Sequence, residues 1–100
     1  MLPHRVDLRP LDAITANGRV FKPAVSDVRA FVEDDEELVR DAHGNETVSD
    51  TKVTLDPEHE IPVGSMITIW KGTQSERTAK VVKISGRSNA ALEYIAYRLV

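Results

Sequence analysis

Apolar and polar residues alternate in short runs along most of this chain, with the period of two that is typical of β-strands. Such runs occupy residues 28–33, 66–71, 77–85 and 92–100, and Gly, Pro, Asn or Asp residues separate them. Helical spacing is poor almost everywhere. The pattern therefore predicts an all-β fold of about six short strands, arranged as a small antiparallel β-barrel or sandwich.

The last three runs are joined by short polar turns, so we expect antiparallel neighbours. Alternation along these runs predicts a core made by Ile67, Ile69, Val82, Ile84, Ile95 and Leu99. Both faces of the last run carry apolar residues, which indicates a strand covered on both sides. Residues 1–23 are punctuated by prolines and by the turn dipeptide Asn17-Gly18, and we predict an irregular segment with one short strand around Val6 and Leu8.

Residues 33–50 form a charged excursion between strand-like blocks. Residues 38–41 and 47–50 flank a turn centred on Gly44, which can adopt a positive φ, so the sequence predicts an extended acidic loop closed by a hairpin. A helix over residues 34–42 is the alternative, because acidic residues favour a first helical turn. We prefer the hairpin, since its strand pairing needs no cap.

Composition places the chain among single-domain proteins. Its 100 residues suit one domain, and the formal net charge of -3 gives no strong attraction to nucleic acid or to an anionic membrane. The absence of cysteine excludes disulfides and thiolate chemistry. No apolar run approaches the length of a membrane span, and the first residues lack a signal-peptide core, so we expect synthesis in the cytoplasm and no membrane partner.

The residues that could carry chemistry do not form a catalytic pattern. His4, His43 and His59 lack metal-ligand spacing and are interpreted as solvated loop residues. The carboxylate run 33–37 lacks the spacing of an EF-hand loop, and no serine has a nucleophile-elbow context. We therefore expect no enzyme, no cofactor and no metal, and interpret the acidic run as a solvated surface or one that repels polyanions.

Aromatic and basic residues in the last third leave a second possibility open. Lysines and arginines make this part basic, as in small barrels that bind nucleic acid. Tyr94 and Tyr97 fall on opposite strand faces, so they cannot form one stacking platform. We therefore take Trp70, Tyr94 and Tyr97 as candidate core or interface residues, and keep a nucleic-acid-binding or protein-interaction module as the alternative function.

Four segments, in order, carry a resemblance to a known family: LVRDAHGNETVSDTKVTL (38–55), IPVGSMITI (61–69), RTAKVVKIS (77–85) and LEYIAYRLV (92–100). Their order and spacing resemble the head-to-tail stopper family of long-tailed phages, especially siphophages that infect actinobacteria. The resemblance implies an SH3-like, stopper-like β-barrel in the virion neck, made in the host bacterial cytoplasm. It also implies a hexameric ring between the portal-side adaptor and the tail terminator or tail tube.

The resemblance further implies a gate in that ring. In the family an inward-facing loop helps to retain the packaged DNA, which passes through the channel without specific binding. Here this loop maps to residues 33–50. The candidate channel residues are Glu33, Asp34, Asp35, Glu36, Glu37, Arg40, Asp41, His43, Gly44 and Asn45.

Overall fold

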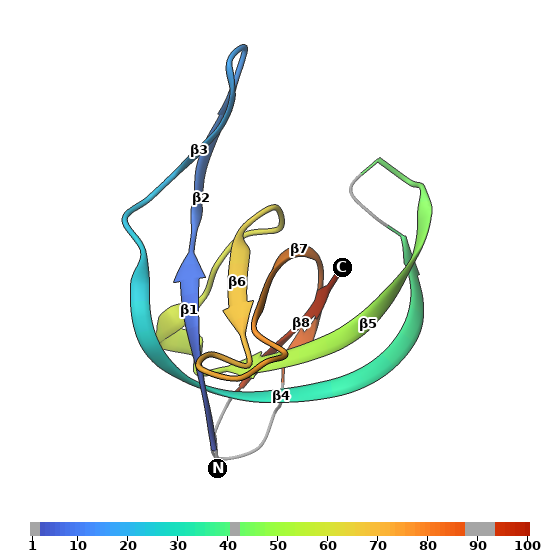
Figure 1. Ribbon diagram of the computed structural model, residues 1–100. Helices are drawn as coiled ribbons and strands as arrows, with labels where there is room; N and C mark the ends of the chain where they lie inside the picture. The colour runs from blue at the N-terminus through green and yellow to red at the C-terminus, as the bar shows by residue number, and fades with distance from the viewer. Residues whose placement is uncertain (1–2, 41–42, 88–93) are drawn as a thin grey trace.

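The computed structural model describes residues 3–40, 43–87 and 94–100, and it is built from antiparallel strands (Figure 1). The main sheet contains β1 (His4–Arg9), β4 (Val25–Arg40), β5 (Glu46–Leu55), β6 (Met66–Ile69), β7 (Arg77–Arg87) and β8 (Ile95–Leu99). Its strand order is β1-β4-β5-β8-β7-β6, and β6 pairs again with β1, so the sheet closes on itself. The all-β, antiparallel prediction is confirmed.

Helical structure plays almost no part in the described residues. The only helix there is one 3-10 turn, η1 (Pro57–His59), which directly follows β5 with Asp56 between them. The helix considered for residues 34–42 is wrong, because residues up to Arg40 belong to β4; Asp41 lies outside the described residues. No helix in the described part is long and apolar enough to cross a membrane.

The inside of the closed sheet holds the core. Its fully or nearly fully buried members come from every strand of the main sheet, with Ile61 added from the β5–β6 connection: Val6, Leu8, Val28, Ala30, Val32, Val53, Leu55, Ile61, Ile67, Ile69, Ala79, Val81, Ile95, Tyr97 and Leu99. The radius of gyration is 13.2 Å, close to the value of about 13 Å expected for a compact domain of this length.

The predicted core is right on β6 and β8 but wrong on β7. Ile67, Ile69, Ile95 and Leu99 lie in the core as expected, whereas Ile84 is 38% exposed and Val82 is buried outside the core cluster. Ala79 and Val81 face inward instead. Both faces of β7 carry apolar side chains, and its pairing with β8 shifts register twice, so alternation alone could not choose the inner face.

The N-terminal segment is more regular than the sequence predicted. β1 pairs with both β4 and β6 and buries Val6 and Leu8, and it is therefore central to the closed sheet. β2 (Leu11–Thr15) and β3 (Gly18–Phe21) form a separate hairpin that stands out from the body (Figure 1). The Lys22 N–H donates to the Pro10 carbonyl over 2.8 Å and closes the base of this hairpin. Pro10 and Pro23 lie between strands and do not prevent the strands on either side from forming.

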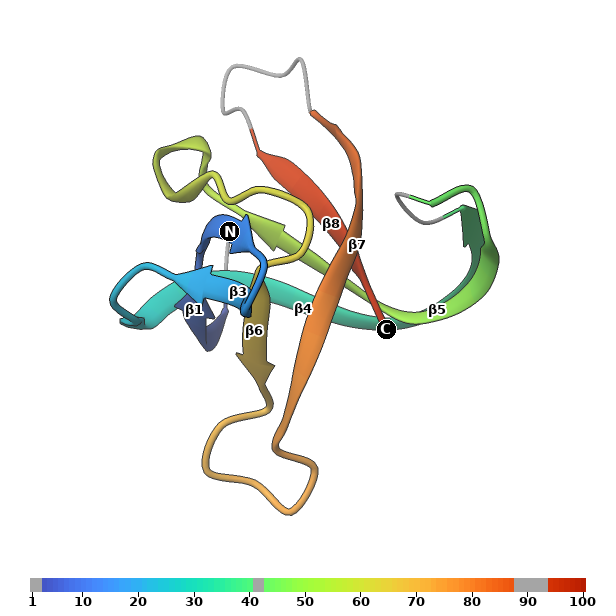
Figure 2. The same ribbon diagram turned by 90° about the horizontal axis from the view of Figure 1, so that it is seen from above.

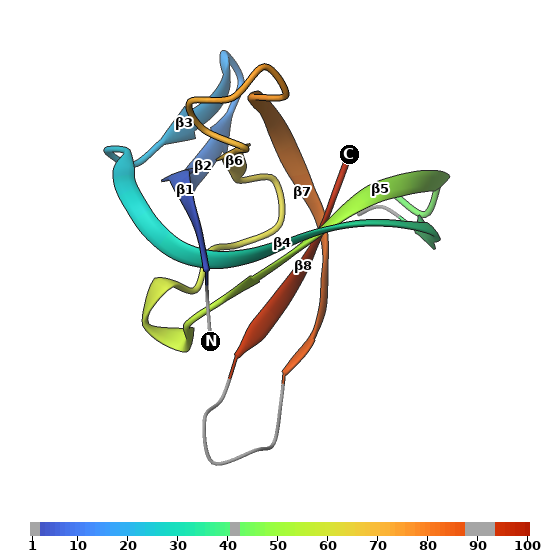
Figure 3. The same cartoon turned by 60° about the horizontal axis from the view of Figure 1, so that its bottom comes forward.

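β4 and β5 extend beyond the residues with which they pair to β1 and β8. Their inner parts pair inside the closed sheet, while residues 37–40 of β4 and 46–49 of β5 continue as a two-stranded extension, named here the distal arm. Figures 1 and 3 show the two strands of the arm leaving the body side by side, and Figure 2 shows the same strands from above. The acidic run is therefore part of a strand, not of a loop.

Candidate functional site

The acidic run interrupts the ladder between β4 and β5. Asp34 pairs with Thr51 and Glu37 pairs with Ser49, so the register shifts between them and leaves Asp35 and Glu36 in a bulge. Bulges bend a strand and redirect its side chains. The side chains from Asp34 to Glu37 are exposed, while Glu33 is partly buried.

Arg98 of β8 holds this bulge from beneath. Its side chain is 1% exposed, and its Nη1 donates to Asp35 Oδ2 over 3.1 Å while its Nη2 donates to the Asp35 carbonyl. The same guanidinium donates to Ser49, from Nε to Oγ and from Nη2 to the carbonyl, both over 3.1 Å. Glu37 Oε2 lies 3.7 Å from Nε. A buried charge needs such partners, so Arg98 couples β8, the acidic bulge and β5.

The sequence pattern does not single out Arg98, which stands there only as one of the basic residues of the last third. One feature of the sequence indicated that Arg98 is buried. Both faces of the last strand carry apolar residues, and a strand covered on both sides also buries its polar side chains. Nothing in the sequence indicated that Asp35 and Ser49 would be its partners, since they lie 63 and 49 positions away.

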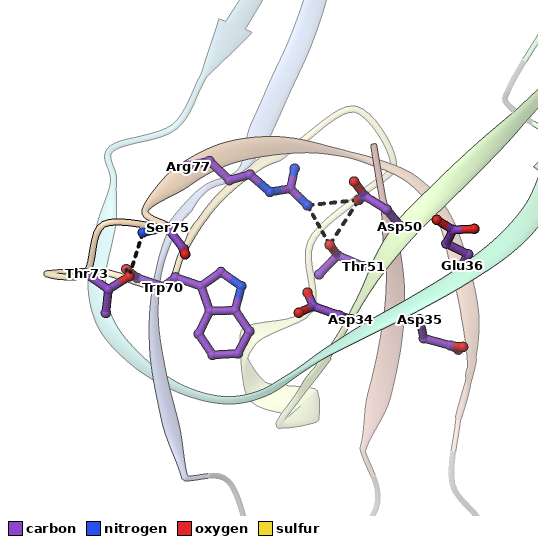
Figure 4. Close-up of a pocket in the computed structure, with 9 residues that line it drawn as sticks. All are labelled: Asp34, Asp35, Glu36, Asp50, Thr51, Trp70, Thr73, Ser75 and Arg77. Carbon is purple, nitrogen blue, oxygen red and sulfur yellow. Dashed lines mark hydrogen bonds and ion pairs between the residues drawn. The ribbon is translucent and has the colours of Figure 1, made fainter.

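A hollow of about 850 Å³ opens beside the acidic bulge, between β4, β5 and the connection from β6 to β7 (Figure 4). Its lining combines carboxylates, hydroxyls, one arginine and one aromatic ring: Asp34, Asp35, Glu36, Asp50, Thr51, Trp70, Thr73, Ser75 and Arg77. Its size is in the range of about 300–1,000 Å³ that is usual for ligand sites.

Arg77 and Asp50 form the polar wall of the hollow (Figure 4). Arg77 Nη2 lies 2.8 Å from Asp50 Oδ1 and 2.5 Å from Thr51 Oγ1, and Thr51 Oγ1 donates to Asp50 Oδ1 over 3.0 Å. Partial desolvation raises the pKa of Asp50, but the Thr51 hydrogen bond and the Arg77 charge outweigh it, so the net pKa lies below its usual value. Asp50 is therefore ionised at neutral pH.

Trp70 forms the aromatic wall. It is partly buried, packs against the core and has a φ of +55°, which is unusual for a bulky residue and orients the indole toward the hollow. Its backbone carbonyl accepts a hydrogen bond of 2.6 Å from Thr73 Oγ1. The imidazole of His4 meets the indole edge-on, with ring centroids 5.1 Å apart. The His4 contact supports one edge of the ring.

His4 is a correction to the sequence interpretation. It lies in β1 rather than in a solvated loop, and its Nδ1 accepts a hydrogen bond of 3.0 Å from the Val32 N–H. Its ring also stacks on Phe31, with centroids 5.8 Å apart. His4 is thus a structural support for the Trp70 wall.

The other predicted interface residues have different surroundings. Tyr97 is fully buried in the core, and its hydroxyl accepts a hydrogen bond of 3.1 Å from the Ile61 N–H, so Tyr97 as an interface residue is wrong. Tyr94 is partly buried, and Trp70 keeps part of its surface exposed. Trp70 is the member of this set that reaches the hollow.

The remaining candidate channel residues lie on the distal arm. Arg40 forms an exposed ion pair of 3.6 Å with Glu46, and Gly44 has a φ of +79° beyond it, as a tight turn requires. His43 and Asn45 are exposed at the same end. The structure thus separates the predicted set into an acidic bulge beside the hollow and a mixed-charge tip.

The arrangement suits binding through charge and an aromatic face. Among the described residues, no group of three or more histidine, aspartate or glutamate side chains is placed to hold a metal ion.

No family model matches the chain, and no curated protein sequence matches it.

Proposed function

We propose that this protein is a head-to-tail stopper, a structural subunit of a phage neck that joins the portal-side adaptor to the tail and helps to gate the DNA channel. It acts by assembly, without catalysis. The proposal interprets the closed sheet as a small SH3-like barrel and takes its subunit partners from the sequence resemblance.

One observation carries the proposal: the β4–β5 extension rises from the closed sheet in the segment to which the family's channel loop maps, and its root is rich in carboxylates. The side chains of Asp34, Glu36 and Glu37 are exposed there. Ionised carboxylates that face DNA repel its phosphates, so a genome can slide past without adhering. Arg98 anchors the bulge, so these charges keep a fixed position.

Exposed apolar residues on the two projecting hairpins support an assembling protein. Leu38 and Val48 face each other across the distal arm and are 62% and 55% exposed. Ile14 and Val20 are exposed on the β2–β3 hairpin. Apolar side chains at the ends of projecting hairpins gain free energy when a neighbouring subunit covers them.

A small nucleic-acid-binding barrel is the second candidate. The observation in its favour is the partly exposed Trp70, which could stack on a base. Its surroundings argue against this, because Asp34, Asp35, Glu36 and Asp50 line the same hollow and repel a phosphate backbone.

The test is reconstitution with the portal–adaptor complex of the phage that encodes this chain, followed by electron microscopy. A ring of this protein on the adaptor supports the proposal. Salt-dependent binding of duplex DNA by the isolated chain, without attachment to the adaptor, would contradict it and favour the second candidate.

A further inference from the structure

We propose that the hollow beside Trp70 is a binding site for a guanidinium group, supplied by an arginine side chain on a neighbouring protein molecule. This inference is independent of the proposed function, because it rests only on the geometry and charge of the hollow.

The indole of Trp70 supplies the face of the site. Figure 4 shows the ring among the lining residues, with the Asp34 carboxylate to one side of it and the Arg77 side chain above it. A cation over an indole face is attracted by the π electrons, and tryptophan is the best aromatic partner. The planar guanidinium can stack on the ring and donate hydrogen bonds in its own plane to carboxylates at the edge.

The charges that line the hollow are not balanced within the chain. Arg77 pairs with Asp50, and Arg98 reaches Asp35 from beneath. Asp34 and Glu36 make no ion pair with any residue in the described part of the chain. The site therefore has a net negative charge that Arg77 does not balance, next to an aromatic ring that would stabilise a further cation.

Size and ligand chemistry favour an arginine-bearing segment over a small ion. A volume of about 850 Å³ is far larger than a calcium ion needs, and calcium would take six to eight oxygen ligands at about 2.3–2.6 Å. A lysine ammonium is more strongly hydrated than a guanidinium and cannot stack, so arginine is the preferred occupant.

The experiment uses Trp70, the sole tryptophan of the chain, as its own fluorescent reporter. The full chain is titrated with a short peptide whose only charged group is one arginine side chain, and in parallel with versions in which lysine or citrulline replaces the arginine. We expect a saturable change in emission with arginine, binding at least about fivefold weaker with lysine, and no saturable change with citrulline, which keeps the shape but lacks the charge.

Matched variants separate the site from general electrostatics. Asp34→Asn removes one carboxylate from the hollow, and Asp12→Asn removes one from the exposed β2 strand. We expect Asp34→Asn to weaken arginine binding by about five- to tenfold and Asp12→Asn to leave it unchanged. Equal affinities of the two variants, or an equal response to arginine and citrulline, would overturn the proposal.

A dilution series of the chain alone identifies the source of the arginine. Emission that changes with protein concentration, and does so less in Asp34→Asn, assigns the arginine to a second copy of this chain. Emission that is independent of concentration, together with saturable binding of the arginine peptide, assigns it to a different protein.

Discussion

Arg98 and Asp35 join the last strand to the acidic bulge: Nη1 of Arg98 donates to Asp35 Oδ2 over 3.1 Å, and Nη2 donates to the carbonyl of the same residue. The contact spans 63 positions of sequence. It fixes the base of the distal arm to β8, a strand of the closed sheet whose inward side chains belong to the core. The position of the acidic residues is therefore set by a buried cation.

Removing that cation should loosen the arm. We expect Arg98→Ala to lower the free energy of unfolding by about 2–4 kcal/mol, because it leaves the carbonyls of Asp35 and Ser49 without their donor and opens a cavity. The carboxylates of Asp35 and Glu37 are exposed and stay solvated, which limits the loss. Chemical denaturation measures the change.

The control is Arg29→Ala, which removes an exposed guanidinium from the same strand as the bulge. We expect it to change stability by less than about 0.5 kcal/mol. Amide exchange in residues 37–40 should become faster in Arg98→Ala only. Equal effects of both substitutions would show that Arg98 does not hold the bulge.

Alanine substitutions at two isoleucines test which side chains of β6 and β7 face the core. Ile67→Ala should destabilise the protein by about 2–5 kcal/mol, since Ile67 is fully buried in the core. Ile84→Ala should cost less than about 1 kcal/mol, because this side chain is partly exposed on the outer face of β7. Thermal or urea unfolding of both variants measures the difference, and a larger loss for Ile84→Ala would contradict the inner face assigned to β7.

Stability should also fall in acid through Asp7. Its hydrogen bond with Lys71, at 2.7 Å, holds the pKa of Asp7 below its usual value against a smaller opposing effect of burial. A lowered pKa means that the contribution to stability is complete above the ordinary aspartate pKa of 3.8 and is lost as the pH falls through the lowered pKa.

The measurement is unfolding of the parent chain and of Asp7→Asn across that range. We expect the parent to be more stable at neutral pH and the difference to shrink below about pH 4. Asp12→Asn serves as the control, because Asp12 is exposed on β2. A difference between the parent and Asp7→Asn that persists in strong acid would mean that the ion pair is not its source.

Alternation of apolar residues was sufficient to predict the strand-rich fold and the inner faces of β6 and β8, because only one face of β6 is strongly apolar and Ile95, Tyr97 and Leu99 share a face of β8. It failed on β7, where Ala79 and Val81 compete with Val82 and Ile84 and register shifts alter the phase. Local pattern carries no information on such long-range register.

The candidate site was only partly predictable for the same reason. The acidic run and Trp70 each stood out in the sequence, but their meeting in one hollow depends on the closure of the sheet. The role of Arg98 follows only from the three-dimensional structure, in which its side chain contacts the bulge of β4. The short strand predicted around Val6 and Leu8 is β1, but the sequence did not predict its central place in the closed sheet or the β2–β3 hairpin that follows it.

The proposed stopper function is tested most directly by a density map of the neck in purified virions of a phage whose genome carries this sequence. The account predicts a ring of this protein between the portal-side adaptor and the tail, with Asp34, Glu36 and Glu37 facing the DNA channel. A neck that lacks the protein, or a ring with these carboxylates on its outer surface, would contradict it.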